Sequence, residues 1–168
     1  RFKSQLASLP IHDFPRVVLP DTDFEISIPA LVFRRVLEQV AFAMAQQDVR
    51  YFFNGMLIDF ANDKLRTVAT NGQRLALSEI ETGASGGQII VPRKAIAEIL
   101  KLAKGEEEVL LQVSESHLLV KQGPRHLSTK LIDAVYPDYE RALPKRREVS
   151  AVVNRLEMRS ALNRMSIL

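Results

Sequence analysis

The chain of 168 residues is long enough for one domain with flanking segments, and its 46% apolar and 26% charged residues exclude a disordered tail, a collagen and a bundle of membrane spans. Without cysteine it has neither a disulfide framework nor a catalytic thiol, which fits a reducing compartment. Lys and Arg number 23 against 20 Asp and Glu, and the resulting net charge of +3 tolerates an anionic partner without requiring one.

The order of the segments predicts one complete domain with an attachment on each side. Residues 1–20 form a connector with several prolines. The chain opens on Arg1 without the apolar stretch of a signal peptide, so we expect it to be a piece of something longer. Residues 21–141 are predicted to be the complete domain. Residues 142–168 are predicted to be a charged connector followed by the first strand and helix of another copy.

A repeated pattern of apolar positions indicates that the domain consists of two similar halves. A shift of 63 residues places Ile28-Pro29 on Val91-Pro92, and the helical stripes that follow the two prolines also coincide. Each copy predicts a strand, a proline at the first helical position and an amphipathic helix. A shift of 125 residues places Ile28 on Val153 and the first helix on the last one. Chance similarity would explain one shift, whereas the two together indicate duplication.

The residues between the helices alternate between apolar and polar with the period of a β-strand. Residues 51–60 predict a hairpin, because Asn54-Gly55 suits the two positive φ angles of a type I′ turn. Further strands are predicted at residues 65–70, 74–80, 109–113, 118–120 and 126–130. We therefore expect an α+β fold of duplicated strand, helix and antiparallel-strand half-units, with two helices packed on one face of the sheet.

The last predicted helix has an apolar stripe but no sheet of its own to cover. The stripe consists of Met158, Ala161, Leu162, Met165 and Leu168. We expect this helix to be partly disordered or docked on a neighbouring chain.

No cluster of residues predicts catalysis, a metal site or a cofactor site. The three histidines, His12, His117 and His126, lack a second ligand at helical spacing, and the acidic run at residues 106–108 is typical of a solvated turn. The chain contains no nucleophile elbow, P-loop or dinucleotide-binding glycine pattern. A hydrolase or transferase is therefore disfavoured.

Basic residues on the predicted helices form a candidate surface for phosphate groups. They are Lys94, Lys101 and Lys104, opposite the apolar stripe of the second helix, and Arg34 and Arg35 on the first. The alternative is that these side chains only solvate exposed helices, and acidic residues on the same helices dilute their charge. A second candidate is the segment of residues 66–77, for which the simpler interpretation is a hairpin turn with Arg74 on its rim and Leu75 in the core.

Five separated motifs resemble the β subunits of bacterial DNA polymerase III, the family of sliding clamps. They are QDVRY at residues 47–51 with NGML at 54–57, LRTVATNGQRLA at 65–76, IVPRK at 90–94, KLID at 130–133 with YPDY at 136–139, and LP at 143–144. The resemblance implies a DNA-clamp fold that comprises the end of the first clamp domain, the complete middle domain and the start of the third. It also implies a cytoplasmic, non-enzymatic processivity factor without cofactor or membrane contact. Two subunits would form a homodimeric ring around double-stranded DNA, with helices inside and sheets outside.

The resemblance implies which residues contact DNA. They are Gln47, Arg50, Tyr51, Phe52, Arg93, Lys94 and Lys101. Such residues contact phosphates and read no bases, so binding would be independent of DNA sequence and would weaken with salt. This chain has Tyr51-Phe52 where some relatives have two tyrosines, which removes one hydroxyl group.

A peptide-binding groove between the middle and third domains is implied as well. Its residues match Phe53, Thr70, Gly72, Gln73, Arg74, Leu75, Pro137, Arg141 and Ala142. The implied partners are the DNA polymerase III alpha subunit, the clamp-loader delta subunit and other proteins that carry clamp-binding peptides. Asn71 and Gln73 stand where many relatives have Asp and His, which changes the expected specificity. The alternative function is a tandem-repeat scaffold that binds peptides and does not encircle DNA.

Overall fold

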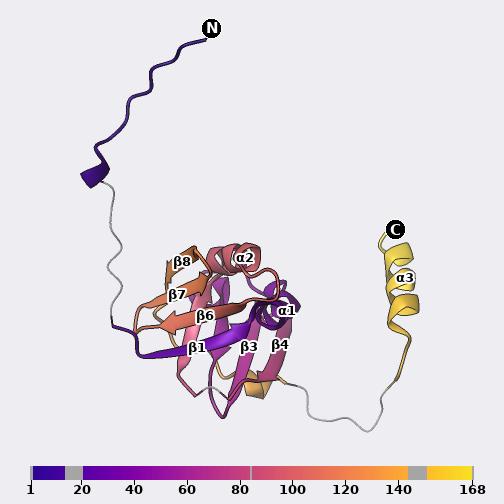
Figure 1. Cartoon of the computed structure of the whole chain (residues 1–168). Coiled ribbons are helices and arrows are strands. Elements are labelled where there is room, and N and C mark those ends of the chain that lie inside the picture. The colour runs from indigo at the N-terminus through magenta and orange to yellow at the C-terminus, as the bar shows by residue number, and fades with distance from the viewer. Residues whose placement is uncertain (1, 14–20, 84, 144–150, 168) are drawn as a thin grey trace. The chain divides into compact units, whose positions relative to one another are not determined.

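The computed structural model describes residues 2–13, 21–83, 85–143 and 151–167 (Figure 1). The chain divides into two compact units, residues 1–136 and residues 137–168.

The main elements of the first unit form two similar halves. The first half is β1 (Phe24–Pro29), α1 (Ala30–Ala41), β2 (Gly55–Asp59), β3 (Lys64–Thr70) and β4 (Leu75–Glu81), with the 3₁₀ helix η2 (Tyr51–Asn54) before β2. The second half is β5 (Gln88–Pro92), α2 (Arg93–Leu102), β6 (Glu108–Val113), β7 (His117–Gln122) and β8 (Arg125–Lys130). A 3₁₀ turn, η1 (Ile11–Asp13), lies nearer the N-terminus. The predicted order of strand, helix and antiparallel strands is confirmed in both halves.

The strands form two antiparallel four-stranded sheets, in the orders β1-β6-β7-β8 and β4-β3-β2-β5. Each half therefore contributes its first strand to the sheet of the other half. In the first exchange Ile26 of β1 lies opposite Leu111 of β6. In the second, Ile90 of β5 lies opposite Leu57 of β2. Because backbone hydrogen bonds join the halves in both sheets, we expect the two halves to fold together.

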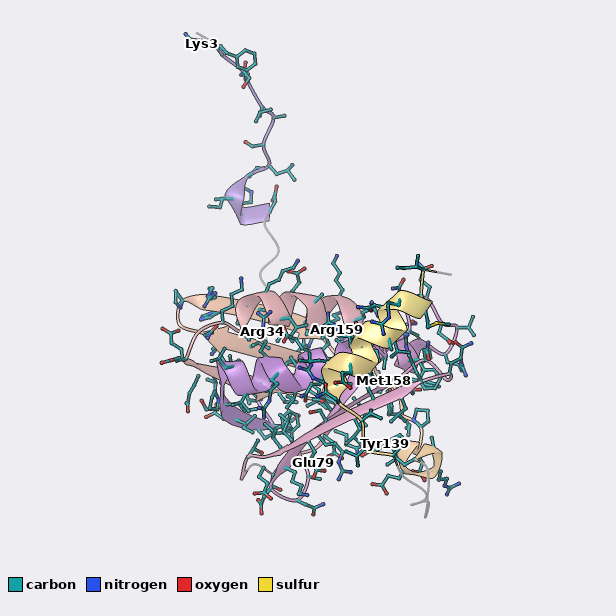
Figure 2. The ribbon with its side chains drawn as sticks, turned by 90° about the vertical axis from the view of Figure 1, so that its right-hand side faces the viewer. Lys3, Arg34, Glu79, Tyr139, Met158 and Arg159 are labelled. Carbon is teal, nitrogen blue, oxygen red and sulfur yellow. The ribbon has the colours of Figure 1, made fainter. Side chains whose placement is uncertain are left out.

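Helices α1 and α2 lie side by side on one side of the first unit (Figure 2). They run antiparallel, since the Arg34 guanidinium in the first part of α1 donates to the carbonyl of Leu100 near the end of α2 over 2.7 Å. Pro29 and Pro92 directly precede the helices, with ψ angles of 127° and 143° that belong to the preceding strands. The prolines are therefore cap residues and not, as predicted, the first helical residues.

One hydrophobic core joins both helices and both sheets. Positions that the 63-residue shift relates are buried together in this core. These pairs are Phe33 with Ile96, Val36 with Ile99, and Val40 with Ala103. The burial of equivalent positions confirms the α+β fold with duplicated halves, and it explains the repeat in the sequence as a repeat in packing.

The hairpin predicted around Asn54-Gly55 is wrong. Residues 51–54 form η2, and Gly55 has a φ angle of −133° instead of the positive angle that a type I′ turn needs. The turn preference of the Asn-Gly pair is overridden by bonds within the loop, because the Asn54 side chain bonds to the backbone of Asp48, six residues earlier. The hairpin turn lies after β2 instead, where Asn62 and Asp63 have φ angles of 57° and 59°.

The second unit contains the 3₁₀ helix η3 (Tyr139–Ala142) and α3 (Arg155–Met165). As the 125-residue shift predicts, α3 begins 125 residues after the start of α1. The strand predicted before α3 is absent from residues 151–154, since no partner strand pairs with this segment, and residues 144–150 lie outside the described part. No described residue of α3 is buried, and Leu168 of its predicted stripe also lies outside the described part. No helix in the described ranges is long and apolar enough to span a membrane.

Candidate functional site

Residues 44–54 form a closed loop between α1 and β2, called here the 44–54 loop. The N–H of Ala45 donates to the carbonyl of Phe53 over 2.9 Å and closes the base of the loop. The Arg93 guanidinium, at the start of α2, donates to the carbonyl of Met44 over 3.0 Å. A backbone bond and a side chain from another element therefore hold the base in place.

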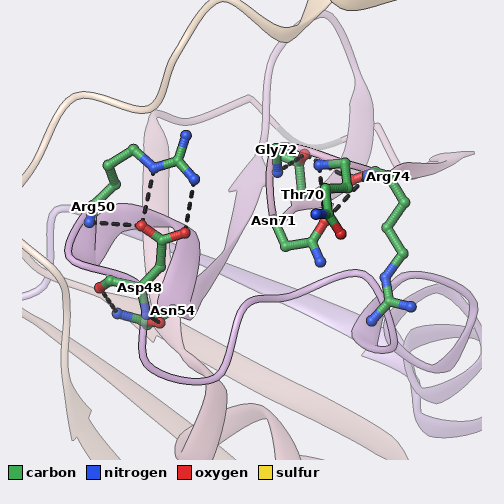
Figure 3. A network of polar contacts seen from close by, with 8 residues as sticks. Asp48, Arg50, Asn54, Thr70, Asn71, Gly72 and Arg74 are labelled. Atoms are coloured by element: carbon green, nitrogen blue, oxygen red, sulfur yellow. Dashed lines mark hydrogen bonds and ion pairs between the residues drawn. The ribbon is translucent and has the colours of Figure 1, made fainter.

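A polar network centred on Asp48 holds the middle of the loop (Figure 3). The Asp48 carboxylate accepts from the Arg50 N–H and Nε over 2.9 Å each and from its Nη2 over 2.7 Å. The Asn54 amide bonds to both backbone groups of Asp48 over 2.9 Å. The hydrogen bonds from the Arg50 side chain and backbone lower the pKa of Asp48 to about 2, so the network is ionised near neutral pH.

Aromatic rings anchor the end of the loop to the body of the unit. The Phe53 side chain is buried, and its ring meets that of Phe52 edge to face with centroids 4.6 Å apart. The buried Tyr136 ring lies 6.2 Å from the Phe53 ring. The Arg50 guanidinium covers the Phe53 ring at 4.7 Å, close enough for a cation–π contact. Tyr51 in contrast is 57% exposed, so η2 presents this ring to solvent.

The turn between β3 and β4 is held by side chains of its own (Figure 3). The side-chain Oδ1 of Asn71 accepts from the N–H groups of Gln73 and Arg74 over 3.1 Å each. The Thr70 hydroxyl donates to the Arg74 carbonyl over 2.7 Å and accepts from the Gly72 N–H over 3.0 Å. Gly72 has a φ angle of +87°, which glycine adopts without strain. The turn therefore has a fixed shape.

The 44–54 loop and this turn surround an open hollow of about 540 Å³. Its lining consists of Met44, Ala45, Gln46, Gln47, Asp48, Arg50, Asn71, Gly72, Gln73 and Arg74. The structure thus brings Gln47 and Arg50 of the predicted DNA contacts together with three residues of the predicted groove. Amide and guanidinium groups dominate the lining, which suits a ligand rich in carbonyl or carboxylate oxygens.

The predicted basic residues on the helices differ in their surroundings. Lys94 and Lys101 are exposed on α2, and the Lys101 ammonium pairs with Glu98 at 2.8 Å. Arg93 is half-buried and bonded to the 44–54 loop. The prediction for Lys104 is corrected, because α2 ends at Leu102 and Lys104 lies beyond the helix, although it is exposed.

The remaining predicted groove residues lie on two separate units. Phe53, Thr70 and Leu75 belong to the first unit, where Leu75 is half-buried at the start of β4. The other residues, Pro137, Arg141 and Ala142, belong to the second unit and are exposed. There the Arg141 Nε pairs with Asp138 at 2.8 Å.

Asp48 and Asn54 are structurally important residues that the sequence interpretation missed. The Asn-Gly pair at Asn54 is a strong local signal for a turn, and it hides the role of the side chain. An aspartate two residues before an arginine is a weak signal of a local Asx-type bond, and it is present in the sequence. In the described ranges no three His, Asp or Glu side chains gather closely enough to hold a metal ion.

The described fold and loops match a known family. The profile described as "DNA polymerase III beta subunit, central domain" matches residues 27–138. The chain belongs to this family. A relative from Proteus mirabilis, named Beta sliding clamp, is 38% identical over 172 residues, which cover 100% of this chain and 47% of the relative. The Beta sliding clamp of Pseudomonas aeruginosa has the same identity and coverage. The chain spans about half the length of these sliding-clamp relatives.

Solved sliding clamps share the fold. A Pseudomonas aeruginosa clamp bound to griselimycin matches with a TM-score of 0.90 and 38% identity, over 95% of this chain and 44% of the clamp. A Caulobacter crescentus clamp matches with a TM-score of 0.76 and 37% identity, over 82% of this chain and 39% of the clamp. These matches confirm the family resemblance and the clamp-type fold that the motifs predict.

Proposed function

We propose that the chain is the central part of a DNA sliding clamp, a ring that encircles duplex DNA and tethers replication and repair proteins to it. The observation that supports this most strongly is the match of residues 27–138 to the central domain of the DNA polymerase III beta subunit. Residues 21–141 would be the middle clamp domain, residues 1–20 the end of the domain before it, and residues 142–168 the beginning of the domain after it. The parts of the sliding-clamp relatives that this chain does not cover would complete the subunit, and two such subunits would form the ring as a homodimer.

The antiparallel pair of α1 and α2 is the proposed DNA-facing side. Lys94 and Lys101 project from α2, and the 44–54 loop adds Gln47, Arg50 and Tyr51, with Phe52 beside them. Arg93 would act mainly by holding that loop through Met44. Because few positive charges are concentrated on this side and acidic residues lie between them, contacts to phosphates would be weak enough to permit sliding.

The β3–β4 turn and the residues beside it are the proposed partner side. Phe53, Thr70, Gly72, Gln73, Arg74 and Leu75 would form the part of the groove that belongs to the first unit. For Pro137, Arg141 and Ala142 of the second unit, the groove assignment rests on the family resemblance alone. Leucine or phenylalanine anchors of a partner peptide would contact Leu75, while Arg74 would bind its backbone or carboxylates. The alpha subunit of DNA polymerase III and the clamp-loader delta subunit are the expected owners of such peptides.

This function needs no catalytic group, and we propose a non-enzymatic accessory subunit that acts in the bacterial cytoplasm, where the chromosome lies. The deciding experiment uses a chimera in which residues 27–138 replace the matching segment of the Pseudomonas aeruginosa clamp. After loading, the chimera should stay on circular DNA in high salt and leave the same DNA once it is linearised. Equal loss from both forms would refute encirclement and favour the peptide-binding scaffold.

The partner side is tested separately with Leu75→Asp in the same chimera. Since Leu75 is half-buried and not part of the central core, we expect the thermal midpoint to change by only a few degrees. Binding of a short peptide with Leu and Phe anchors, measured by fluorescence polarisation, should be lost. Unchanged peptide affinity would remove Leu75 from the proposed groove, and a large loss of thermal stability would mark it as a core residue.

A further inference from the structure

The Asn54 side chain closes a ring across the 44–54 loop. Its Oδ1 accepts from the N–H of Asp48 and its Nδ2 donates to the carbonyl of Asp48, each over 2.9 Å. The Asn54 amide therefore takes the place of backbone partners for the N–H and the carbonyl of Asp48. Both Asp48 and Asn54 are partly buried, so these bonds are partly shielded from competition with water.

The Asp48 carboxylate fixes the next part of the same ring. It accepts three hydrogen bonds from Arg50, one from the backbone and two from the guanidinium. The Phe53 N–H donates in turn to the Arg50 carbonyl over 2.9 Å. Hydrogen bonds within the segment thus involve Asp48, Arg50, Phe53 and Asn54. These bonds hold the backbone in place on both sides of Tyr51.

The held guanidinium also connects the loop to the turn between β3 and β4. A Cβ at Gly72 would lie only 3.2 Å from the Nη2 of Arg50, so the guanidinium packs directly over this glycine. Its other side covers the Phe53 ring. The Arg50 side chain therefore packs against the loop and pairs with Asp48 while part of it stays exposed. The other exposed residues of the loop are Gln46, Gln47, Val49 and Tyr51.

We propose that Asp48 and Asn54 are positioning residues that hold the 44–54 loop in the shape that presents Gln47 and Tyr51 to duplex DNA. This inference rests on the proposed DNA-binding function. A loop that is already ordered does not lose backbone freedom on binding, and fixing one residue costs about as much free energy as a tenfold change in affinity. Neither residue needs to contact DNA for this effect.

The test separates loop order from charge and from overall stability. The sequence contains no tryptophan, so Tyr51→Trp provides a single fluorescent probe on the loop for the quenching measurement, whereas DNA binding is measured with Tyr51 in place. In both backgrounds Asn54→Ala removes two bonds without changing the net charge, and Asp48→Ala removes the carboxylate. Asp138→Ala is the matched control, because Asp138 likewise accepts from a backbone N–H two residues on and pairs with an arginine, but in the second unit.

Quenching of the introduced tryptophan by acrylamide and binding of a short DNA duplex at low salt are measured on the full chain. We expect Asn54→Ala to raise the quenching constant about twofold and to weaken DNA binding about tenfold, while Asp138→Ala leaves the quenching constant unchanged and does not weaken DNA binding. Asp48→Ala should raise quenching similarly, although removing its charge offsets part of the loss in DNA binding. If Asn54→Ala does not fold, Asp48→Asn, which keeps one acceptor oxygen, should give a smaller rise in quenching.

Unchanged quenching in the Asn54 and Asp48 variants would overturn the proposal. Increased quenching with unchanged DNA affinity in Asn54→Ala would overturn it too, because loop order would then not matter for binding. If the parent chain binds no duplex DNA, the proposed DNA contacts of Gln47 and Tyr51 fail and the positioning role fails with them, whereas encirclement is decided separately by the chimera. The quenching comparison needs no DNA and would still show whether these residues close the loop.

Discussion

At the scale of single residues, Gly55 occupies a position where no larger side chain fits. A Cβ there would lie 2.8 Å from the Ile132 Cδ1, from the Ile90 Cγ2 and from the Val91 carbonyl oxygen. The side-chain atoms can shift, but the carbonyl oxygen belongs to the neighbouring strand of the sheet. Because Gly55 has no side chain, β2 can pair with β5 while the Ile132 side chain occupies the adjacent space. This explains why the position holds a glycine.

We expect Gly55→Ala to lower the free energy of unfolding by about 1–3 kcal/mol, the usual cost of overpacking. Urea unfolding followed by circular dichroism measures this change. Gly87→Ala is the control, since no atom lies within 4 Å of a Cβ at Gly87, and its stability should stay within about 0.5 kcal/mol of the parent. Equal stability of the two variants would contradict the close contact at Gly55.

The contribution of Tyr136 to stability is expected to depend on pH. Burial raises the pKa of its hydroxyl from 10.0 to about 12. Between these values the folded state keeps a proton that the unfolded state has lost, so this contribution to stability is complete below pH 10 and declines as the pH rises through about 12. We expect Tyr136→Phe to lose less stability than the parent when urea unfolding is compared below and above pH 10. Parallel pH profiles of the two proteins would show that the hydroxyl titrates normally.

At the scale of elements, the end of α2 is held by a buried side chain from β7. Gln122 is 1% exposed, its Nε2 donates to the carbonyl of Lys104 over 2.7 Å, and its Oε1 accepts from the N–H of Lys104. The N–H and the carbonyl of Lys104, just after the last turn of α2, thus both have a hydrogen-bond partner in the Gln122 side chain.

Gln122→Ala should lower the free energy of unfolding by about 1–3 kcal/mol, because both Lys104 backbone groups lose their partners in a partly buried place. Amide hydrogen exchange at Lys104 should accelerate in the same variant. Gln112→Ala serves for comparison, since within the described ranges the Gln112 side chain bonds to the exposed side chain of Glu25, and its loss should cost less than about 0.5 kcal/mol. A similar loss in the two variants would mean that the bonds to Lys104 contribute little.

How much of each element could be predicted depends on how local its cause is. The helices and most strands follow from apolar spacing, which is why equivalent residues such as Phe33 and Ile96 are both buried. The exchange of β1 and β5 could not be predicted, because it depends on pairing between segments far apart in the chain. The role of Asn54 could not be predicted for a different reason: Asp48 is only six residues away, but the bonds between the two residues form only when the loop closes.

The candidate site could be predicted in its residues but not in its arrangement. The motifs at residues 47–57 and 65–76 carry the family resemblance, and they supply most of the lining of the hollow. That Gln47 and Gln73 line one hollow depends on the position of the 44–54 loop beside the β3–β4 turn. Likewise, nothing in the helical spacing of Arg93 indicates that it bonds to Met44.

At the scale of the whole molecule, the clamp proposal requires that the helical side of the first unit attract DNA without holding it fast. Lys94 and Lys101 are exposed there, and Glu98 pairs with one of them. Lys121 and Lys130 instead lie on β7 and β8. Lys121 alternates with buried neighbours and Lys130 with half-buried ones, which places both side chains on the face away from the core. The two pairs of lysines carry the same charge on different sides, which allows a matched comparison.

Lys94→Glu with Lys101→Glu, made in the Pseudomonas chimera, should shorten retention on linear DNA with a free end roughly fivefold to tenfold at low salt, since each reversal replaces a phosphate contact by repulsion and speeds sliding off that end. Single-molecule fluorescence on DNA tethered at one end measures the retention time. Lys121→Glu with Lys130→Glu should leave it within about twofold. The difference should shrink in high salt, because about 1 M salt reduces the screening length to about 3 Å. If the strand-side pair shortened retention as much as the helix-side pair, net charge alone would control binding and the helices would not be the DNA-facing side.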